Sequence, residues 1–260
     1  MILTTDIGNT TMTIGLFTHE GQLEFRGSLK TDKNKTRDQI AVDFLDMFRL
    51  NGGDIHQVTG AIVSSVVPPM TAAAAGAIRR LAGVTPMVLG PGLKTGMNIL
   101  AEIHNQLGSD IVASSVAALQ KYPAPIIVID MGTATTLSYL GKNTYEGCVI
   151  IPGVRIAVEA LSGRAAELPH ISLEDPLTVM GRSTIDAMRA GVVYGNAGMI
   201  DSIIERMEAA AKPAATIVMT GGNADLILKH CRHKIIYDEN LLIDGLFYLY
   251  QKNRRRRKED

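Results

Sequence analysis

Apolar and polar stretches alternate along the chain in an order that occurs twice. Each half opens on three short apolar segments that the pattern predicts as hairpin-linked strands, at residues 1–6, 12–17 and 23–29 and again at 126–130, 137–140 and 145–151. Helical segments, buried strands and short apolar runs follow, at residues 37–50, 61–66 and 86–89 and again at 183–211, 216–220 and 234–237. This order predicts an α/β fold of two mixed βββαβ sheets flanked by helices.

The same turn motif follows the first strand of each half. The first copy is Asp6-Ile7-Gly8-Asn9-Thr10, and the second is Asp130-Met131-Gly132-Thr133-Ala134-Thr135. Because the motif and the element order recur together, the sequence indicates a gene duplication, with a cleft between the two halves. We place the boundary between Lys121 and Tyr122, which gives an N-terminal lobe of residues 1–121 and a C-terminal lobe of residues 122–260.

The two turns have the composition of phosphate-binding turns. Gly8 and Gly132 allow a tight turn that brings backbone N–H groups close to an anion, and the threonines add hydroxyl donors. Asp6 and Asp130 end buried strands, where a carboxylate can hold a hydrated Mg²⁺ ion. The alternative is a pair of plain hairpin turns. The predicted phosphate-binding residues are Asp6, Gly8, Asn9, Thr10, Gly132, Thr133, Ala134 and Thr135, and the predicted metal-binding residues are Asp6 and Asp130.

A pair of glycines follows the buried strand of the second half. Gly221 and Gly222 come directly after Thr220. Paired glycines at this place let the backbone approach a flat ligand, so they predict the border of an adenosine site. The alternative is an ordinary turn between a strand and a helix.

Composition narrows the classes of function. The 260 residues carry 26 Lys+Arg and 26 Asp+Glu, so bulk charge does not attract the chain to nucleic acid or to a membrane surface. Two cysteines cannot form a disulfide scaffold, which favours the cytoplasm. No apolar stretch reaches the roughly 18 residues of a membrane span. We therefore expect neither a nucleic-acid partner nor a membrane partner.

These motifs resemble those of a known family nearly end to end. The Asp6 turn, the Asp130 turn and the glycine pair look like the two phosphate motifs and the adenosine motif of the acetate kinase, sugar kinase, heat-shock 70 and actin superfamily. Within it, the chain is similar to type III pantothenate kinase. Further matching segments are Ser64-Ser-Val-Val-Pro68, Gly90-Pro-Gly-Leu-Lys-Thr-Gly96, Pro152-Gly153, Arg164-Ala-Ala-Glu-Leu-Pro169, Gly181-Arg-Ser-Thr184 and Leu242-Ile-Asp-Gly-Leu246.

The resemblance implies an actin-like ATPase fold of two ribonuclease H-like lobes and a defined reaction. The family transfers a phosphoryl group from ATP to the hydroxyl of pantothenate, the first step of coenzyme A biosynthesis. It implies Mg²⁺ with ATP, a monovalent cation (K⁺ or NH₄⁺), and a homodimer. It also implies Asp110 as the catalytic base. The implied substrate-binding residues are Gly108, Ser109, Asp110, Ile111 and, from the neighbouring subunit, Thr184.

The acceptor side departs from the family pattern. Gly108-Ser109-Asp110-Ile111 stands where members typically carry Gly-Ala-Asp-Arg, and residues 101–104 and Gly147-Cys148 also differ. An arginine would recognise the pantothenate carboxylate, and Ile111 offers neither charge nor donor. Another arginine could take over the carboxylate; the candidates are Arg155, Arg164 and Arg182. Otherwise the chain is a kinase for another small hydroxy acid, or a non-catalytic ATP-binding regulator that pairs with a paralogue as a heterodimer.

Several residues also have structural interpretations. Asp110 and Thr184 could cap helices. Gly191, Gly195 and Gly198 favour close helix packing, either within the core or across a dimer. His230-Cys231-Arg232-His233 has no second ligand pair, so surface residues are favoured over a zinc site. The basic run at residues 254–258 is typical of a solvated tail.

Overall fold

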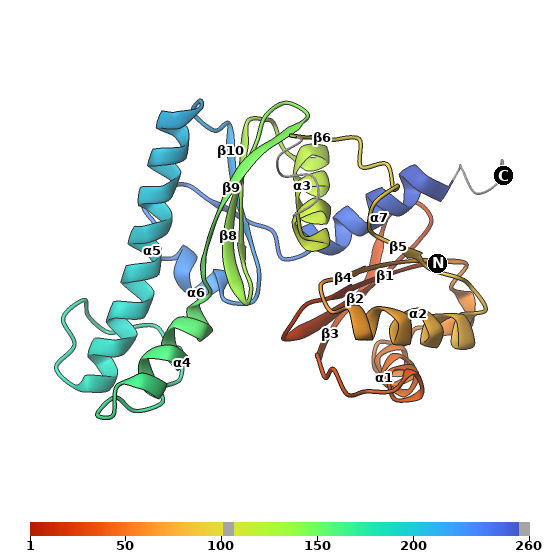
Figure 1. Ribbon diagram of the computed structural model, residues 1–260, viewed down its shortest axis with the longest axis horizontal. Helices are drawn as coiled ribbons and strands as arrows, with labels where there is room; N and C mark the ends of the chain where they lie inside the picture. Colours follow the sequence, from red (N-terminus) through yellow and green to blue (C-terminus); the bar gives the residue numbers. More distant parts are fainter. Residues whose placement is uncertain (101–106, 255–260) are drawn as a thin grey trace. The chain divides into compact units, whose positions relative to one another are not determined.

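The computed structural model describes residues 1–100 and 107–254. The substituted segment at residues 101–104 and most of the basic run at 254–258 therefore lie outside the described residues. The described chain forms two compact units, shown in Figure 1. One unit contains the residues up to Ala117 and those from Asn240 onward, and the other runs from Ala118 to Glu239.

The first unit contains a five-stranded mixed sheet. Its strands lie in the order β3-β2-β1-β4-β5. β1 pairs antiparallel with β2 and parallel with β4. In chain order the elements are β1 (Ile2–Ile7), β2 (Thr11–Phe17), β3 (Leu23–Lys30), α1 (Arg37–Leu50), a 3-10 turn (Ile55–Gln57), β4 (Gly60–Ser65), α2 (Pro68–Ala82), β5 (Met87–Val88), β6 (Asn98–Ile99), α3 (Ser109–Lys121) and, near the C-terminus, α7 (Leu241–Arg254).

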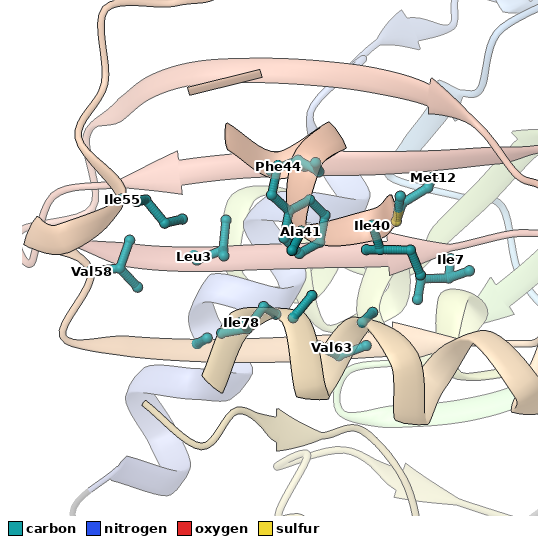
Figure 2. Packing of buried hydrophobic residues seen from close by; sticks show 14 of the residues in the cluster. Leu3, Ile7, Met12, Ile40, Ala41, Phe44, Ile55, Val58, Val63 and Ile78 are labelled. Atoms are coloured by element: carbon teal, nitrogen blue, oxygen red, sulfur yellow. The ribbon is translucent and has the colours of Figure 1, made fainter. Parts of the chain in front are cut away.

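Helices cover both faces of this sheet. Figure 2 shows one face, where Leu3 and Val63 of the strands pack against Phe44 of α1 and Ile78 of α2. The side chains alternate along each strand, so Ile2 and Ile62 point to the other face, which α3 and α7 cover. The sheet is thus buried on both sides, as its nearly continuous apolar strands require.

A capping box defines where α1 begins. The Thr36 hydroxyl accepts a hydrogen bond from the Gln39 backbone N–H, and the Gln39 side chain accepts one from the Thr36 N–H at 2.8 Å. These two bonds satisfy backbone donors that a helix start leaves unpaired. The observed helix has the predicted bounds, residues 37–50.

The second unit repeats the arrangement. Its strands β11, β10, β7, β8 and β9 lie side by side in that order, with β7 antiparallel to β8 and parallel to β10. Val193, Ile200 and Ile204 of the long helix α5 pack on the apolar face of β7 and β10. The elements are β7 (Ile126–Met131), β8 (Ala134–Leu140), β9 (Thr144–Pro152), α4 (Val154–Arg164), α5 (Thr184–Ala210), β10 (Thr216–Thr220), α6 (Ala224–Leu228) and β11 (Ile236–Tyr237).

The predicted fold class is confirmed, because both sheets have the mixed βββαβ order with helices alongside. The compact units differ from the predicted lobes at the C-terminus. The prediction places the residues from Asn240 to the end of α7 in the second lobe, whereas α7 packs against β1, β2 and β4 of the first unit. No helix among the described residues combines the length and apolar character that a bilayer span requires.

Candidate active site

The first phosphate-type turn joins β1 to β2 and is held from outside by one threonine. Within the turn, the Gly8 N–H donates to the Thr11 carbonyl at 3.0 Å. Thr31, which follows β3, donates its N–H to the Thr10 carbonyl at 2.9 Å and its hydroxyl to the Gly8 carbonyl at 2.8 Å. Asn9 and Thr10 remain exposed. The turn therefore has a fixed backbone and an accessible outer edge.

The second turn joins β7 to β8 and is one residue shorter. Ile7 pairs with Met12 across the first hairpin, whereas Met131 pairs with Thr135 across the second. The Gly132 N–H donates to the Ala134 carbonyl at 3.1 Å, and Gly132, Thr133 and Ala134 are all exposed. The two turns thus share their position in the fold without being identical in backbone geometry.

Gly153 supports the second turn in the place that Thr31 takes beside the first. Its N–H donates to the Thr133 carbonyl at 3.2 Å. A β-carbon on Gly153 would lie 2.2 Å from the Thr133 carbonyl oxygen and 2.5 Å from that of Gly132. Such distances are far inside van der Waals contact, so only glycine lets the chain after β9 lie against this turn.

Thr135 does not present its side chain to an open site. The residue is fully buried, and its hydroxyl has no hydrogen-bond partner among the described residues. Side chains alternate along β8, so Thr135 and Leu137 point into the unit, and Thr136 points the other way. The expectation of a phosphate-binding hydroxyl thus fits the exposed Thr133 and does not fit Thr135.

The two aspartates occupy equivalent positions in their sheets. Asp6 lies opposite Ser64 of the parallel strand β4, and Asp130 lies opposite Thr220 of the parallel strand β10. Asp6 is 8% exposed, and its Oδ1 accepts a hydrogen bond of 2.7 Å from the Ser64 hydroxyl. Asp130 is partly exposed. Each unit therefore supplies one carboxylate at the end of its central strand.

Gly221 and Gly222 have different structural roles. Gly221 has φ +101°, and a β-carbon there would lie 2.7 Å from the backbone N, C and O of Met131. Both its conformation and its approach to β7 therefore require glycine. Gly222 is exposed, and a β-carbon on it would meet no atom within 4 Å. Its lack of a side chain leaves open space at the end of β10.

The predicted base lies in the first turn of α3. Asp110 is the second residue of this helix and is half-buried. Its Oδ1 accepts a hydrogen bond of 2.8 Å from the Ile111 N–H. A β-carbon on Gly108 would lie 2.3 Å from that same oxygen. Asp110 therefore lies inside the helix and is not its N-cap, which corrects the capping interpretation, and among the described residues its half-buried carboxylate bonds only the next backbone N–H.

Thr184 is not the cap of α5, which corrects one of its two interpretations. Ser183 is the N-cap: its hydroxyl accepts from the Asp186 N–H at 3.1 Å and lies 2.7 Å from Asp186 Oδ2. Thr184 is the first helical residue and is exposed. Capping therefore does not account for its presence.

The His230-Cys231-Arg232-His233 segment is an anchored turn. Asp201 of α5, which is 1% exposed, accepts hydrogen bonds from the backbone N–H groups of Arg232 and His233 and from His233 Nδ1 at 2.7 Å. Burial alone would raise the pKa of Asp201, but these hydrogen bonds outweigh burial and lower the pKa. Burial and the Asp201 charge raise the pKa of Cys231 to about 12. Among the described residues, no three His, Cys, Asp or Glu side chains form a metal-binding group.

Sequence reasoning gave no role to three residues that build this site. Thr31 and Gly153 each follow the third strand of their half and hold a phosphate-type turn. Ser64 holds Asp6. Ser64 and Gly153 lie in segments whose sequence matches the family, and that match is the signal that could have found them. Their hydrogen bonds in the folded chain show what they do.

Comparison with known proteins agrees with this geometry. Residues 2–206 match the family model described as type III pantothenate kinase. A curated type III pantothenate kinase from Bacillus cytotoxicus is 39% identical over 254 residues, which cover 97% of this chain and 97% of the relative.

Two solved structures show the same fold. One, described as a Baf family transcriptional activator from Campylobacter jejuni, has a TM-score of 0.59 at 20% identity and covers 97% of this chain and 99% of that chain. The other, the activator of 2-hydroxyisocaproyl-CoA dehydratase from Clostridium difficile with bound ADPNP, has a TM-score of 0.56 at 12% identity. It covers 100% of this chain and 97% of that chain.

Proposed function

The chain belongs to the type III pantothenate kinase family and phosphorylates pantothenate with ATP in coenzyme A biosynthesis, and we propose how its residues carry out that reaction. One observation supports the proposal most strongly. The chain, which matches the family over residues 2–206, has two exposed phosphate-type turns. A neighbouring residue holds each turn in place, and an aspartate lies beside each. The free thiols Cys148 and Cys231 accord with a cytoplasmic enzyme.

The two turns bind the phosphates of ATP. Both turns have exposed residues, and backbone N–H groups at a sharp turn are a common anion-binding arrangement. The exposed hydroxyls of Thr10 and Thr133 add donors. Gly221 and Gly222 border the adenosine, because the first lets the backbone lie close to β7 and the second leaves space beside it.

Asp6 and Asp130 hold the divalent metal that accompanies ATP, which we propose is Mg²⁺. The donor set fits this ion, since Mg²⁺ prefers carboxylate and water oxygens. The hydrogen bond from Ser64 fixes the orientation of the Asp6 carboxylate. When bound, the ion neutralises charge on the phosphates.

A monovalent cation, K⁺ or NH₄⁺, is proposed on family resemblance, and we assign no residue to it.

Asp110 is the catalytic base in this proposal. It accepts the proton of the pantothenate hydroxyl while the hydroxyl oxygen attacks the γ-phosphorus of ATP, and the bond from that phosphorus to the ADP oxygen breaks. The hydrogen bond from the Ile111 N–H holds the Asp110 carboxylate in place in the first turn of α3. Gly108, Ser109, Ile111 and, from a second subunit, Thr184 complete the acceptor pocket.

Ile111 has no charge with which to bind the pantothenate carboxylate. Either another residue binds this carboxylate, or the chain binds pantothenate more weakly. Arg155, Arg164 and Arg182 are exposed and remain the candidates for that contact. Ile111→Arg should lower the KM for pantothenate by up to about ten- to a hundredfold, because it adds a charge-assisted bond that acts before the chemical step. Steady-state kinetics at saturating Mg·ATP measures this effect.

Ile111→Gln is the matched control, since it adds a polar side chain without charge and should recover little. If Ile111→Arg leaves KM unchanged while turnover is measurable, the carboxylate is held by another residue or the pocket accepts a different hydroxy acid. A panel of hydroxy acids then separates these two cases.

We further propose a homodimer in which α5 lies at the interface. Gly191, Gly195 and Gly198 are exposed on this helix, and a β-carbon on any of them would meet no atom within 4 Å. The glycines therefore do not serve close packing inside the described chain. The segment before α5 also exposes Leu177, Val179 and Met180, which a second copy could cover.

We expect purified protein at micromolar concentration to have about twice the 27.9 kDa mass of one chain. Gly195→Glu should shift the population to monomer, because it places a charge in an interface without space for a side chain. Gly163→Glu, at another exposed helical glycine with open space around it, is the control. Light scattering that gives 27.9 kDa at every concentration would contradict the homodimer and leave a heterodimer with a paralogue as the alternative.

A further inference from the structure

Two serine hydroxyls connect the Asp6 carboxylate to the first residue of the acceptor-site helix. The Ser64 hydroxyl lies 2.7 Å from Asp6 Oδ1, and the Ser109 hydroxyl lies 2.9 Å from the Ser64 hydroxyl. All three residues belong to the first unit. Ser109 begins α3, and the next residue is Asp110.

We infer that Ser109 and Ser64 form a hydrogen-bonded relay that positions Asp110 relative to Asp6, which makes both serines positioning residues for phosphoryl transfer. The inference rests on the proposed roles of Asp6 and Asp110. It adds a function for Ser109, whose hydroxyl the alanine typical of the family would lack.

The Ser64 hydroxyl is the centre of this arrangement. It donates to Asp6 Oδ1 at 2.7 Å and to the Ser109 hydroxyl at 2.9 Å. A serine hydroxyl has one proton and two acceptor sites, so the two contacts share that proton. Ser64 therefore links the Asp6 carboxylate of β1 to the start of α3.

Burial makes these bonds persistent. Ser64 is fully buried, and Ser109 is half-buried. Ser64 points to the same face of the sheet as Ile62, which packs with Ala113 in the middle of α3. A β-carbon on Gly245 of α7 would lie 1.9 Å from the Ala113 carbonyl oxygen, so α7 fits tightly against α3 at that point.

The middle and the start of α3 are thus held in different ways. Apolar packing against the sheet and α7 holds the middle around Ala113. The Ser109 hydroxyl ties the first turn, which carries Asp110, to Ser64 in the sheet. Loss of the Ser109 hydroxyl should therefore loosen the first turn and leave the rest of the helix in place.

The test compares Ser109→Ala with Ser115→Ala. Ser115 lies on the same helix and is fully buried, and its hydroxyl has no partner among the described residues. Ser109→Ala should lower kcat about three- to tenfold, the worth of one hydrogen bond. The KM for Mg·ATP should stay within about twofold of the wild-type value. Ser115→Ala should leave kcat unchanged, and Ser109→Thr, which keeps the hydroxyl, should restore most of the lost kcat.

A double mutant tests whether the two serines act as one unit. Ser64→Ala should lower kcat and weaken Mg·ATP binding, because Asp6 loses the hydrogen bond from the Ser64 hydroxyl. Adding Ser109→Ala to Ser64→Ala should change kcat by less than about twofold, since the relay is already broken. A multiplicative effect in the double mutant would overturn the inference, as would a Ser109→Ala protein with the kcat of Ser115→Ala.

Amide hydrogen exchange provides a readout that does not depend on activity. In Ser109→Ala, exchange at Ile111 and Val112 should become about three- to tenfold faster, whereas exchange at Val116 should not change. Unchanged exchange at the first turn would overturn the relay even in an inactive enzyme. The two assignments can fail separately. If Ser109→Ala shows the faster exchange but Asp110→Asn keeps the wild-type turnover, Asp110 is not the base, and the contact between Ser109 and Ser64 still holds the first turn of α3.

Discussion

Asp110→Asn is expected to lower kcat by about two to four orders of magnitude, the usual contribution of a positioned general base. The asparagine side-chain oxygen can still accept the hydrogen bond that Ile111 donates to Asp110 Oδ1, so the start of α3 should stay folded. What is lost is the ability to take a proton from the acceptor hydroxyl. Rapid-quench or coupled measurement of ADP formation at saturating substrates measures the loss.

Binding measurements separate this effect from damage to the nucleotide site. Asp110→Asn should bind Mg·ATP with nearly the wild-type affinity, because Asp110 contacts the acceptor in our proposal. Asp130→Asn, the matched substitution in the other unit, should weaken Mg·ATP binding, because it removes a carboxylate charge from the metal. If Asp110→Asn keeps more than about a tenth of the wild-type kcat, another group is the base.

Gly153→Ala should disrupt the second phosphate-type turn and lower Mg·ATP affinity tenfold or more. The added β-carbon would lie 2.2 Å and 2.5 Å from two carbonyl oxygens of the turn, and backbone atoms cannot swing aside as a flexible side chain can. Relief of the clash requires a shift of the turn, and misplacement by about 1 Å can cost a hundredfold in activity. We expect a lower melting temperature as well, because overpacking costs about 1–3 kcal/mol. Calorimetric titration and thermal unfolding measure the two effects.

Gly147→Ala is the control for this prediction. Gly147 lies in β9, the strand that leads to Gly153, and a β-carbon there would meet no atom within 4 Å. This variant should bind Mg·ATP as the wild type does. Equal affinity in Gly153→Ala and Gly147→Ala would show that the second turn does not bind phosphate, and a wild-type protein without binding heat at millimolar ATP would remove the nucleotide site altogether.

The sequence predicted the parts of the fold that depend on local pattern. The apolar strands that carry Asp6 and Asp130 appear where they were expected, although each runs one residue past its aspartate. Helix α1 has the predicted bounds because its cap and its apolar spacing are local signals. The placement of α7 was not predictable in this way. Its partners β1, β2 and β4 are distant in sequence. The apolar pattern of a helix near the end of the chain does not indicate which sheet the helix packs against.

The sequence predicted those parts of the candidate site that depend on backbone conformation. The need for glycine at position 221 follows from a turn, and the structure gives it φ +101°. The burial of Thr135 depends on the register of β8, and a threonine within a turn motif gives no sign of that register. The contact between Ser109 and Ser64 joins residues 45 positions apart, so only the folded chain reveals it.

Pantothenate-dependent formation of ADP by the purified protein, with Mg·ATP and K⁺ present, tests the central claim most directly. We expect one phosphorylated pantothenate for each ADP, little ADP without pantothenate, and loss of both products in Asp110→Asn. Mass spectrometry of the product identifies the phosphate ester. A protein that binds Mg·ATP but forms no ADP in response to pantothenate at any concentration would contradict the account.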